Sequence, residues 1–298
     1  MMTGNTAVAP YIRRPENTNF LGAQFLIALL PAFFSVVYFH HLTGFLHLFI
    51  SLLIFSGVEY FFTHFVFKNK EPFDFFCLVD AVCVVLILPT HFPIAFFIPM
   101  LFFLSIVGRQ LLERKLLVFL PLAYIGRMIA FVLSADVILA ENTDILFLLS
   151  GKESPLWGAE CTIALLLGFS YLLFLRWIRL KIVMFFYLFL VVGFLFLLPY
   201  LNIGENIFPF FLVNSVLFFA LFTLTDPRYS PTSFIGQILA ALFSAGVFLL
   251  FSFWDLHTIS VPVTALSICL LLSILRLDVI SIFLKKTFYW RKRKGGRL

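Results

Sequence analysis

The sequence predicts an all-α integral membrane protein with about ten transmembrane helices, arranged as two inverted five-helix repeats. Three observations support this prediction: the 298 residues are 62% apolar and only 12% charged, long apolar runs recur along the chain, and basic residues cluster between alternate runs. An ordinary soluble domain is about one-quarter charged. With a mean hydropathy of +1.07, the composition excludes a soluble enzyme, a disordered chain and a nucleic-acid-binding domain.

The predicted transmembrane helices follow from the lengths of the apolar runs. A helix needs about 20 apolar residues to cross the hydrocarbon core of a bilayer. Spans three and four are short and meet at the proline-containing residues 88–93, where a broken or re-entrant element would also fit. The predicted spans are residues 20–39, 43–67, 73–89, 92–108, 116–134, 157–175, 181–199, 207–225, 234–254 and 258–284.

The orientation of the spans is predicted from the basic residues, because Lys and Arg are enriched in cytoplasmic loops. With the N-terminus in the cytoplasm, 18 of the 21 Lys and Arg residues fall in cytoplasmic segments, Arg109 and Arg228 among them. Both termini are therefore predicted to be cytoplasmic. The predicted division of the chain is a cytoplasmic tail, a membrane domain and a basic cytoplasmic tail, at residues 1–19, 20–284 and 285–298.

The two halves of the membrane domain, residues 20–134 and 157–284, hold five predicted spans each. An odd number of spans gives the halves opposite orientations, which is the inverted-repeat plan of many transporters. The third span of each half ends at a proline turn, at Pro89 in the first half and at Pro227 in the second. Helices interrupted at matching places indicate a site near the middle of the membrane, although ordinary turns between helices explain the same pattern.

Charged side chains inside membrane spans are costly and often functional. Glu59 lies in span two, Asp80 in span three, Arg127 in span five and Glu160 near the outer start of span six. We expect Arg127 to be buried in the bundle, where it could pair with Asp80. Such a pair would fix helix packing, contribute to a cation pathway or hold an anionic cofactor. The four cysteines show no metal-binding or disulfide spacing, so no metal site is predicted.

Several segments carry a family resemblance that extends over residues 11–283. The clearest lies in residues 219–233, which end in LTDPRYSPTS and are similar to a family signature, ATDPVTSPTT. Further similar segments are residues 11–13, 26–32 (LIALLPA), 86–93 (LILPTHFP), 126–127 (a Gly-Arg pair) and 157–162 (WGAECT). In order and spacing, the chain resembles the membrane subunits shared by the Rnf electron-transport complex (its D subunit) and the sodium-pumping NADH:quinone reductase (its B subunit), as a divergent member.

The resemblance implies that FMN is bound. Family members carry FMN covalently on a threonine after the fifth span, and Thr143 stands at this place in the predicted outer loop. Residues 140–144 read AENTD and lack the family's Ser-Gly-Ala context, so a noncovalent flavin alone or no flavin are the alternatives. A second, noncovalent flavin would lie at the turn after span eight. The residues that the resemblance assigns to cofactor binding are Thr143, Arg127, Glu160, Thr162, Thr225, Asp226, Ser230 and Thr232.

The function that the resemblance implies is that of a membrane subunit of a flavin-dependent electron-transport complex coupled to translocation of sodium ions or protons. The protein would lie in the cell inner membrane, with the other subunits of the complex as partners and no nucleic acid. In that function Arg127 would neutralise the flavin, and Glu59, Asp80 or Glu160 would serve the coupling ion. The alternatives are a solute channel or carrier on the same scaffold, and a scaffold subunit that has lost its flavin.

Overall fold

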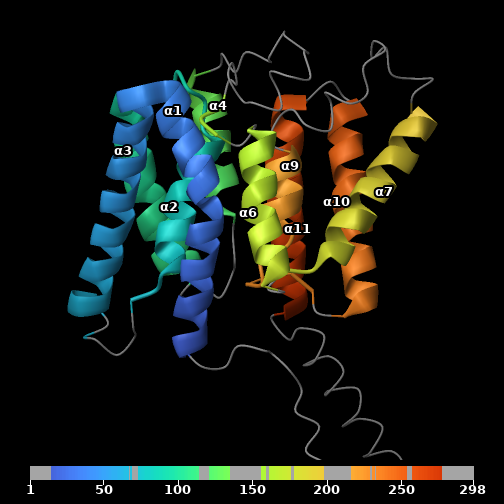
Figure 1. Ribbon diagram of the computed structural model, residues 1–298, viewed down its shortest axis with the longest axis horizontal. Helices are drawn as coiled ribbons and strands as arrows, with labels where there is room; N and C mark the ends of the chain where they lie inside the picture. The colour runs from blue at the N-terminus through green and yellow to red at the C-terminus, as the bar shows by residue number, and fades with distance from the viewer. Residues whose placement is uncertain are drawn as a thin grey trace, which may run out of the picture.

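The computed structural model describes residues 15–66, 68, 73–113, 121–134, 156–158, 161–175, 178–197, 216–228, 230–231, 233–253 and 257–276. The regular elements in these residues are all helices, which confirms the all-α prediction for the described part of the chain. The helices stand side by side in a bundle (Figure 1). Three described stretches are long and apolar enough to cross a membrane, namely Asn19–Val66, Ile94–Glu113 and Phe234–Ser252, and shorter apolar helices accompany them.

The described helices lie at the predicted spans, since each predicted span overlaps at least one of them. The arrangement of the spans as two inverted repeats stays a prediction. The α-helices are α1 (Pro15–Phe61), α2 (Phe76–Ile87), α3 (Ile94–Phe103), α4 (Leu122–Ser134), α6 (Thr162–Phe174), α7 (Leu180–Leu197), α9 (Val216–Phe218), α10 (Phe234–Phe253) and α11 (His257–Arg276). Three π-helical segments are continuous with them: η1 (Phe62–Val66), η2 (Leu104–Glu113) and η3 (Phe219–Thr223).

Helix α1 contains the first two predicted spans, which are separated by a bend at His41. This residue has φ 48° and ψ −132°, a backbone conformation that residues other than glycine rarely adopt. A Cβ atom on Gly44 would lie 2.9 Å from the carbonyl oxygen of Val36, so glycine is needed where the chain turns back. Figure 1 shows this bend at the top of the bundle. The predicted boundary between spans one and two is thereby confirmed.

The predicted break between spans three and four is also confirmed. Helix α2 ends at Ile87, and α3 begins at Ile94. The backbone N–H of Trp157 donates to Leu88 O at 3.1 Å, which joins the short segment 156–158 to the break. The Trp157 ring lies 4.8 Å, centroid to centroid, from the rings of both His40 and His47. The start of the second half therefore packs beside the bend of α1.

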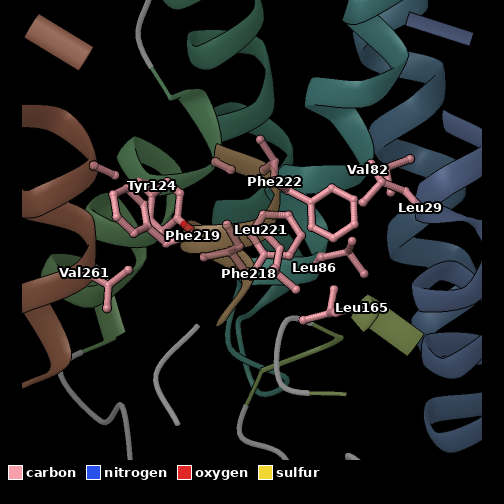
Figure 2. Packing of buried hydrophobic residues seen from close by; sticks show 14 of the residues in the cluster. Leu29, Val82, Leu86, Tyr124, Leu165, Phe218, Phe219, Leu221, Phe222 and Val261 are labelled. Atoms are coloured by element: carbon pink, nitrogen blue, oxygen red, sulfur yellow. The ribbon is translucent and has the colours of Figure 1, made fainter. Parts of the chain in front are cut away.

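The core of the bundle contains the short α9–η3 segment. Figure 2 shows its aromatic side chains in the middle of an apolar layer, with Tyr124 of α4 on one side and Leu29 of α1 and Val82 of α2 on the other. The rings of Phe218 and Phe222 stack with their centroids 5.3 Å apart. Large apolar side chains on the outer helix faces are instead exposed, as a surface in contact with lipid requires.

The two halves of the chain meet closely where α1 packs against α6. Gly168 of α6 lies so near α1 that a Cβ atom built on it would overlap the carbonyl oxygen of Ala28. In membrane proteins, small residues at helix interfaces allow such close approach of backbones. Gly168 therefore sets the distance between these two helices.

Candidate functional site

The turn after span eight is built around Asp226, which precedes Pro227. The Asp226 Oδ1 atom accepts a hydrogen bond from the backbone N–H of Arg228 at 2.9 Å, and the Asp226 carbonyl accepts one from Ser230 N at 2.8 Å. The Thr225 hydroxyl donates to Leu221 O at 2.5 Å. These short-range bonds hold the turn in a fixed shape and place the Arg228 side chain beside the first half of the bundle.

Arg228 binds acidic residues from three elements. Its Nη2 atom lies 2.8 Å from Asp80 Oδ1 on α2 and 2.8 Å from Asp226 Oδ2 on its own turn. Its Nη1 atom lies 3.3 Å from Glu113 Oε1 at the end of η2. The guanidinium also lies over the ring of Phe76, 4.5 Å from the ring centroid, an arrangement that attracts a cation to the aromatic face.

These carboxylates keep Arg228 charged. Burial by itself would lower the pKa of the guanidinium. The carboxylates of Asp226, Asp80 and Glu113 act in the opposite direction and raise the pKa of Arg228 well above its usual value. The turn thus presents a permanent positive charge to the acidic residues of the first half.

Arg109 of η2 forms the second centre of charge. Its guanidinium donates to Asp80, to Asp74 Oδ2 at 2.6 Å and to Glu59 Oε2 at 3.4 Å. Its Nη1 atom lies 3.6 Å from Glu113 Oε2. The side chain is only 4% exposed, so the ion pairs replace water as its surroundings.

The two arginines and their partners form one ionic cluster. Asp80 joins its two centres because it binds both guanidinium groups. Gln110 extends the cluster by donating to Glu59 Oε2 at 2.6 Å. Within the described part of the chain, the ion pairs of the two guanidinium groups therefore gather five carboxylates. The members of the ionic cluster are Glu59, Asp74, Asp80, Arg109, Gln110, Glu113, Asp226 and Arg228.

The ionic cluster lies far from the bend of α1. Glu59 follows His41 by 18 residues, which corresponds to about 27 Å along a helix axis. Asp74 lies just before the start of α2, and Glu113 lies at the end of η2. The cluster thus occupies the end of the bundle that the basic residues predict to be cytoplasmic.

The pairing predicted for Asp80 is wrong. Asp80 binds Arg109 and Arg228, and no ion pair joins it to Arg127, although both residues are in the described part of the chain. The prediction that Arg109 lies in a cytoplasmic loop is also wrong, because η2 carries this residue into the bundle, where it is 3% exposed. The expected burial of Arg127 is confirmed, since it is 2% exposed on α4.

Sequence reasoning missed Arg109, Gln110 and Glu113 as members of the site. Arg109 and Glu113 are four residues apart, so they lie on one face of a helix. They also follow an apolar span that ends on the same side of the membrane as the acidic residue in span two, Glu59. This combination of an intrahelical pair and a nearby buried acid was the available signal.

The residues predicted to bind a cofactor are brought together only in part. Thr225, Asp226 and Ser230 share the turn after span eight, whereas Arg127 lies on α4 and Thr162 begins α6. Thr225, Asp226 and Thr162 are buried. The remaining predicted residues, Thr143, Glu160 and Thr232, lie outside the described residues.

A small cavity lies between the turn and the middle of the bundle. Its volume is about 30 Å³, the size of a single water molecule. Inside it, the Thr223 hydroxyl lies 3.4 Å from the Tyr124 hydroxyl. The remaining lining is mostly apolar. The residues that bring polar atoms or sulfur to the cavity are Asp80, Cys83, Tyr124, Thr223, Asp226 and Arg228.

This arrangement does not fit a flavin at the turn. The cavity is far too small for a three-ring isoalloxazine, and the Arg228 guanidinium already binds three carboxylates. A phosphate placed here would face the negative charges of Asp80 and Asp226. Among the described residues, no group of three or more His, Cys, Asp or Glu side chains is placed to hold a metal ion.

Comparison with known proteins bears on the first half of the chain. No curated protein sequence matches the chain. The model of a family described as the NQR2, RnfD, RnfE family matches residues 5–113, a range that contains Glu59, Asp80, Arg109 and Glu113. Members of this family are membrane subunits of the multi-subunit Rnf and Nqr complexes. The match confirms, over residues 5–113, the resemblance to the Rnf D and Nqr B membrane subunits that the sequence predicts.

Proposed function

We propose that this protein is a membrane subunit of an Rnf/Nqr-type electron-transport complex and that it takes part in the translocation of a cation, either sodium ions or protons. In this proposal the protein lies in the cell inner membrane with both termini in the cytoplasm. Support comes from the family match, the apolar helices and the basic residues between them. Its partners are the other subunits of the complex.

The observation that carries the cation proposal is the gathering of carboxylates in the ionic cluster, which brings together Glu59, Asp74, Asp80, Glu113 and Asp226. Carboxylates inside a bundle surrounded by lipid are costly and often functional. Their oxygen atoms are ligands that a small, hard cation prefers. Arg109 keeps Asp80 and Glu59 at one end of the bundle, where a cation arriving from the cytoplasm would meet them first.

Measurement of cation movement during electron transfer tests this proposal. The complete complex is reconstituted in sealed vesicles, a reductant is supplied to the partner subunits, and sodium uptake and internal pH are followed together. We expect one of the two cations to accumulate in step with electron transfer. Electron transfer without movement of either cation would contradict the cation proposal, and absence of partner subunits after mild purification would contradict the complex.

We also propose that FMN is joined through its phosphate to the hydroxyl of Thr143. The position of Thr143 after the fifth span and on the predicted outer side supports this, and it does not depend on the turn after span eight. The lost Ser-Gly-Ala context and the acids Glu141 and Asp144 oppose it. When bound, the flavin would supply one-electron and two-electron redox chemistry.

The prediction for Thr143 is that flavin fluorescence survives denaturing electrophoresis in the wild-type protein and disappears in Thr143→Val. The protein is expressed together with its own flavin transferase, and Thr162→Val provides a matched control that should stay fluorescent. The reason is that only a covalent bond withstands denaturation. A dark wild-type band under these conditions would remove the covalent site and favour a subunit without this flavin.

A further inference from the structure

The cavity next to the ionic cluster is lined on the side of the turn by Asp226 and Arg228. The Arg228 side chain is 17% exposed, whereas those of Asp80 and Asp226, to which it is bound, are 8% and 6% exposed. Deeper in the bundle, Tyr124 is 1% exposed. Exposure thus falls from Arg228 through the carboxylates to the interior, so the guanidinium lies between the cavity and the end of the bundle.

The ion pairs that join Arg228 to Asp226, Asp80 and Glu113 form two groups that can separate. The contacts with Asp226 lie within one turn, and they involve both the backbone N–H and the guanidinium of Arg228. Those with Asp80 and Glu113 join the turn to helices of the first half, 148 and 115 residues earlier in the chain. A movement of the turn would break the second group and preserve the first.

The carboxylates of the first half keep a positively charged partner when their contacts with Arg228 break. Asp80 and Glu113 each have Arg109 as another partner. Arg228 likewise keeps the carboxylate of Asp226. Removal of a buried charge from all its partners would cost several kcal/mol, but here no charge is left without a partner of opposite sign. The separated arrangement is therefore accessible.

We propose that Arg228 is a gate: its guanidinium closes the cytoplasmic end of the cavity when it binds Asp80 and Glu113, and its withdrawal with Asp226 admits a cation of the size of a water molecule. The opened site presents the carboxylate of Asp80 and the hydroxyls of Thr223 and Tyr124, oxygen atoms that a small cation or a hydronium ion prefers. This inference rests on the proposed translocation of a cation.

The chain contains a natural reporter of the gate and a matched control. Cys83 lines the cavity, one turn of α2 from Asp80. Cys77 lies on the same helix but is fully buried, and its thiol donates to Phe55 O. Cys83 is already partly exposed, so opening of the gate would increase its exposure and leave Cys77 covered.

The experiment treats the complete complex, in membranes with the cytoplasmic side outward, with aminoethyl methanethiosulfonate. The reagent forms a mixed disulfide with a thiolate and releases methanesulfinate, and mass spectrometry measures the rate at each cysteine. We expect Arg228→Gln to raise the Cys83 rate on the order of tenfold or more through a larger open population. Arg228→Lys retains the charge and should stay near the wild-type rate, and the Cys77 rate should not change.

A second variant covers the case in which Arg228→Gln does not fold. Asp80→Asn removes the charge of one of the two attachment points in the first half and leaves Glu113, so Arg228 is held less firmly and the Cys83 rate should again rise. Equal Cys83 rates in the wild type and in the folded variants would overturn the gate, as would a parallel rise at Cys77. An open gate in a complex that moves no cation would refute the proposed function and leave the gate standing.

Discussion

Replacement of Arg109 by methionine is expected to lower the free energy of unfolding by about 3–5 kcal/mol, because it leaves buried carboxylates without their partner. Methionine has a similar length and fills the same space. The loss of unfolding free energy therefore measures the effect of removing the guanidinium charge. Arg109 is the partner shared by Glu59, Asp74, Asp80 and Glu113. Replacement of this one side chain therefore removes an ion-pair partner from all four carboxylates at once.

The loss is measured by thermal or denaturant unfolding in detergent, with Lys181→Met as the control. Lys181 is exposed, and its ammonium lies 5.5 Å from the centroid of the Phe234 ring, a contact worth about 0.5–1 kcal/mol at an exposed site. The loss of unfolding free energy in Arg109→Lys should lie between those of the other two variants. Lysine keeps the positive charge but lacks the planar guanidinium with its several donors. A change in Arg109→Met no larger than in Lys181→Met would show that the cluster contributes little to folding.

The second large effect is expected at the contact between the two halves. Gly168→Ala should destabilise the protein by about 3 kcal/mol, at the upper end of the usual cost of overpacking. The added methyl group would overlap the carbonyl oxygen of Ala28. This atom belongs to the backbone of α1, so the whole helix has to move away.

A matched control exists in α10. A Cβ atom on Gly246 would have no neighbour within 4 Å, so Gly246→Ala should stabilise the helix by roughly 0.5–1 kcal/mol through the lower entropy of the unfolded chain. Both variants add the same methyl group to the middle of an apolar helix, and unfolding in detergent compares them directly. Equal effects at the two positions would mean that the α1–α6 contact is looser than the structure indicates.

The positions of the helices could be predicted from the sequence because length and apolarity determine which segments cross a bilayer. The breaks at His41 and at residues 88–93 were predicted for the same reason, since polar or proline-containing residues interrupt the apolar runs there. Glu59 and Asp80 were identified as costly residues in lipid, and the structure places both in one cluster. These predictions depend on local properties of the chain.

The partner of Asp80 could not be predicted because it depends on the path of the chain after α3. Apolar length suggested that span four ends before Arg109, but π-helical geometry continues to Glu113 and turns Arg109 inward. Such π-helical segments are rare and are often found at functional sites. Arg228 was assigned to a cytoplasmic loop and does lie in a turn, but its binding to Asp80 joins residues 148 positions apart. Neither feature is encoded in local composition.

The ionic cluster also sets an order of events during biosynthesis. The acids of the first half enter the membrane with Arg109, whereas Arg228 follows Glu113 by 115 residues. At ribosomal rates this interval lasts roughly 6–23 seconds. During that time Glu59, Asp74, Asp80 and Glu113 share Arg109 and lack the contacts that Arg228 makes with Asp80 and Glu113 in the folded protein. Arrival of the turn after span eight adds Arg228 as a second guanidinium partner for Asp80 and Glu113, so the ionic cluster is complete only after the second half has docked on the first.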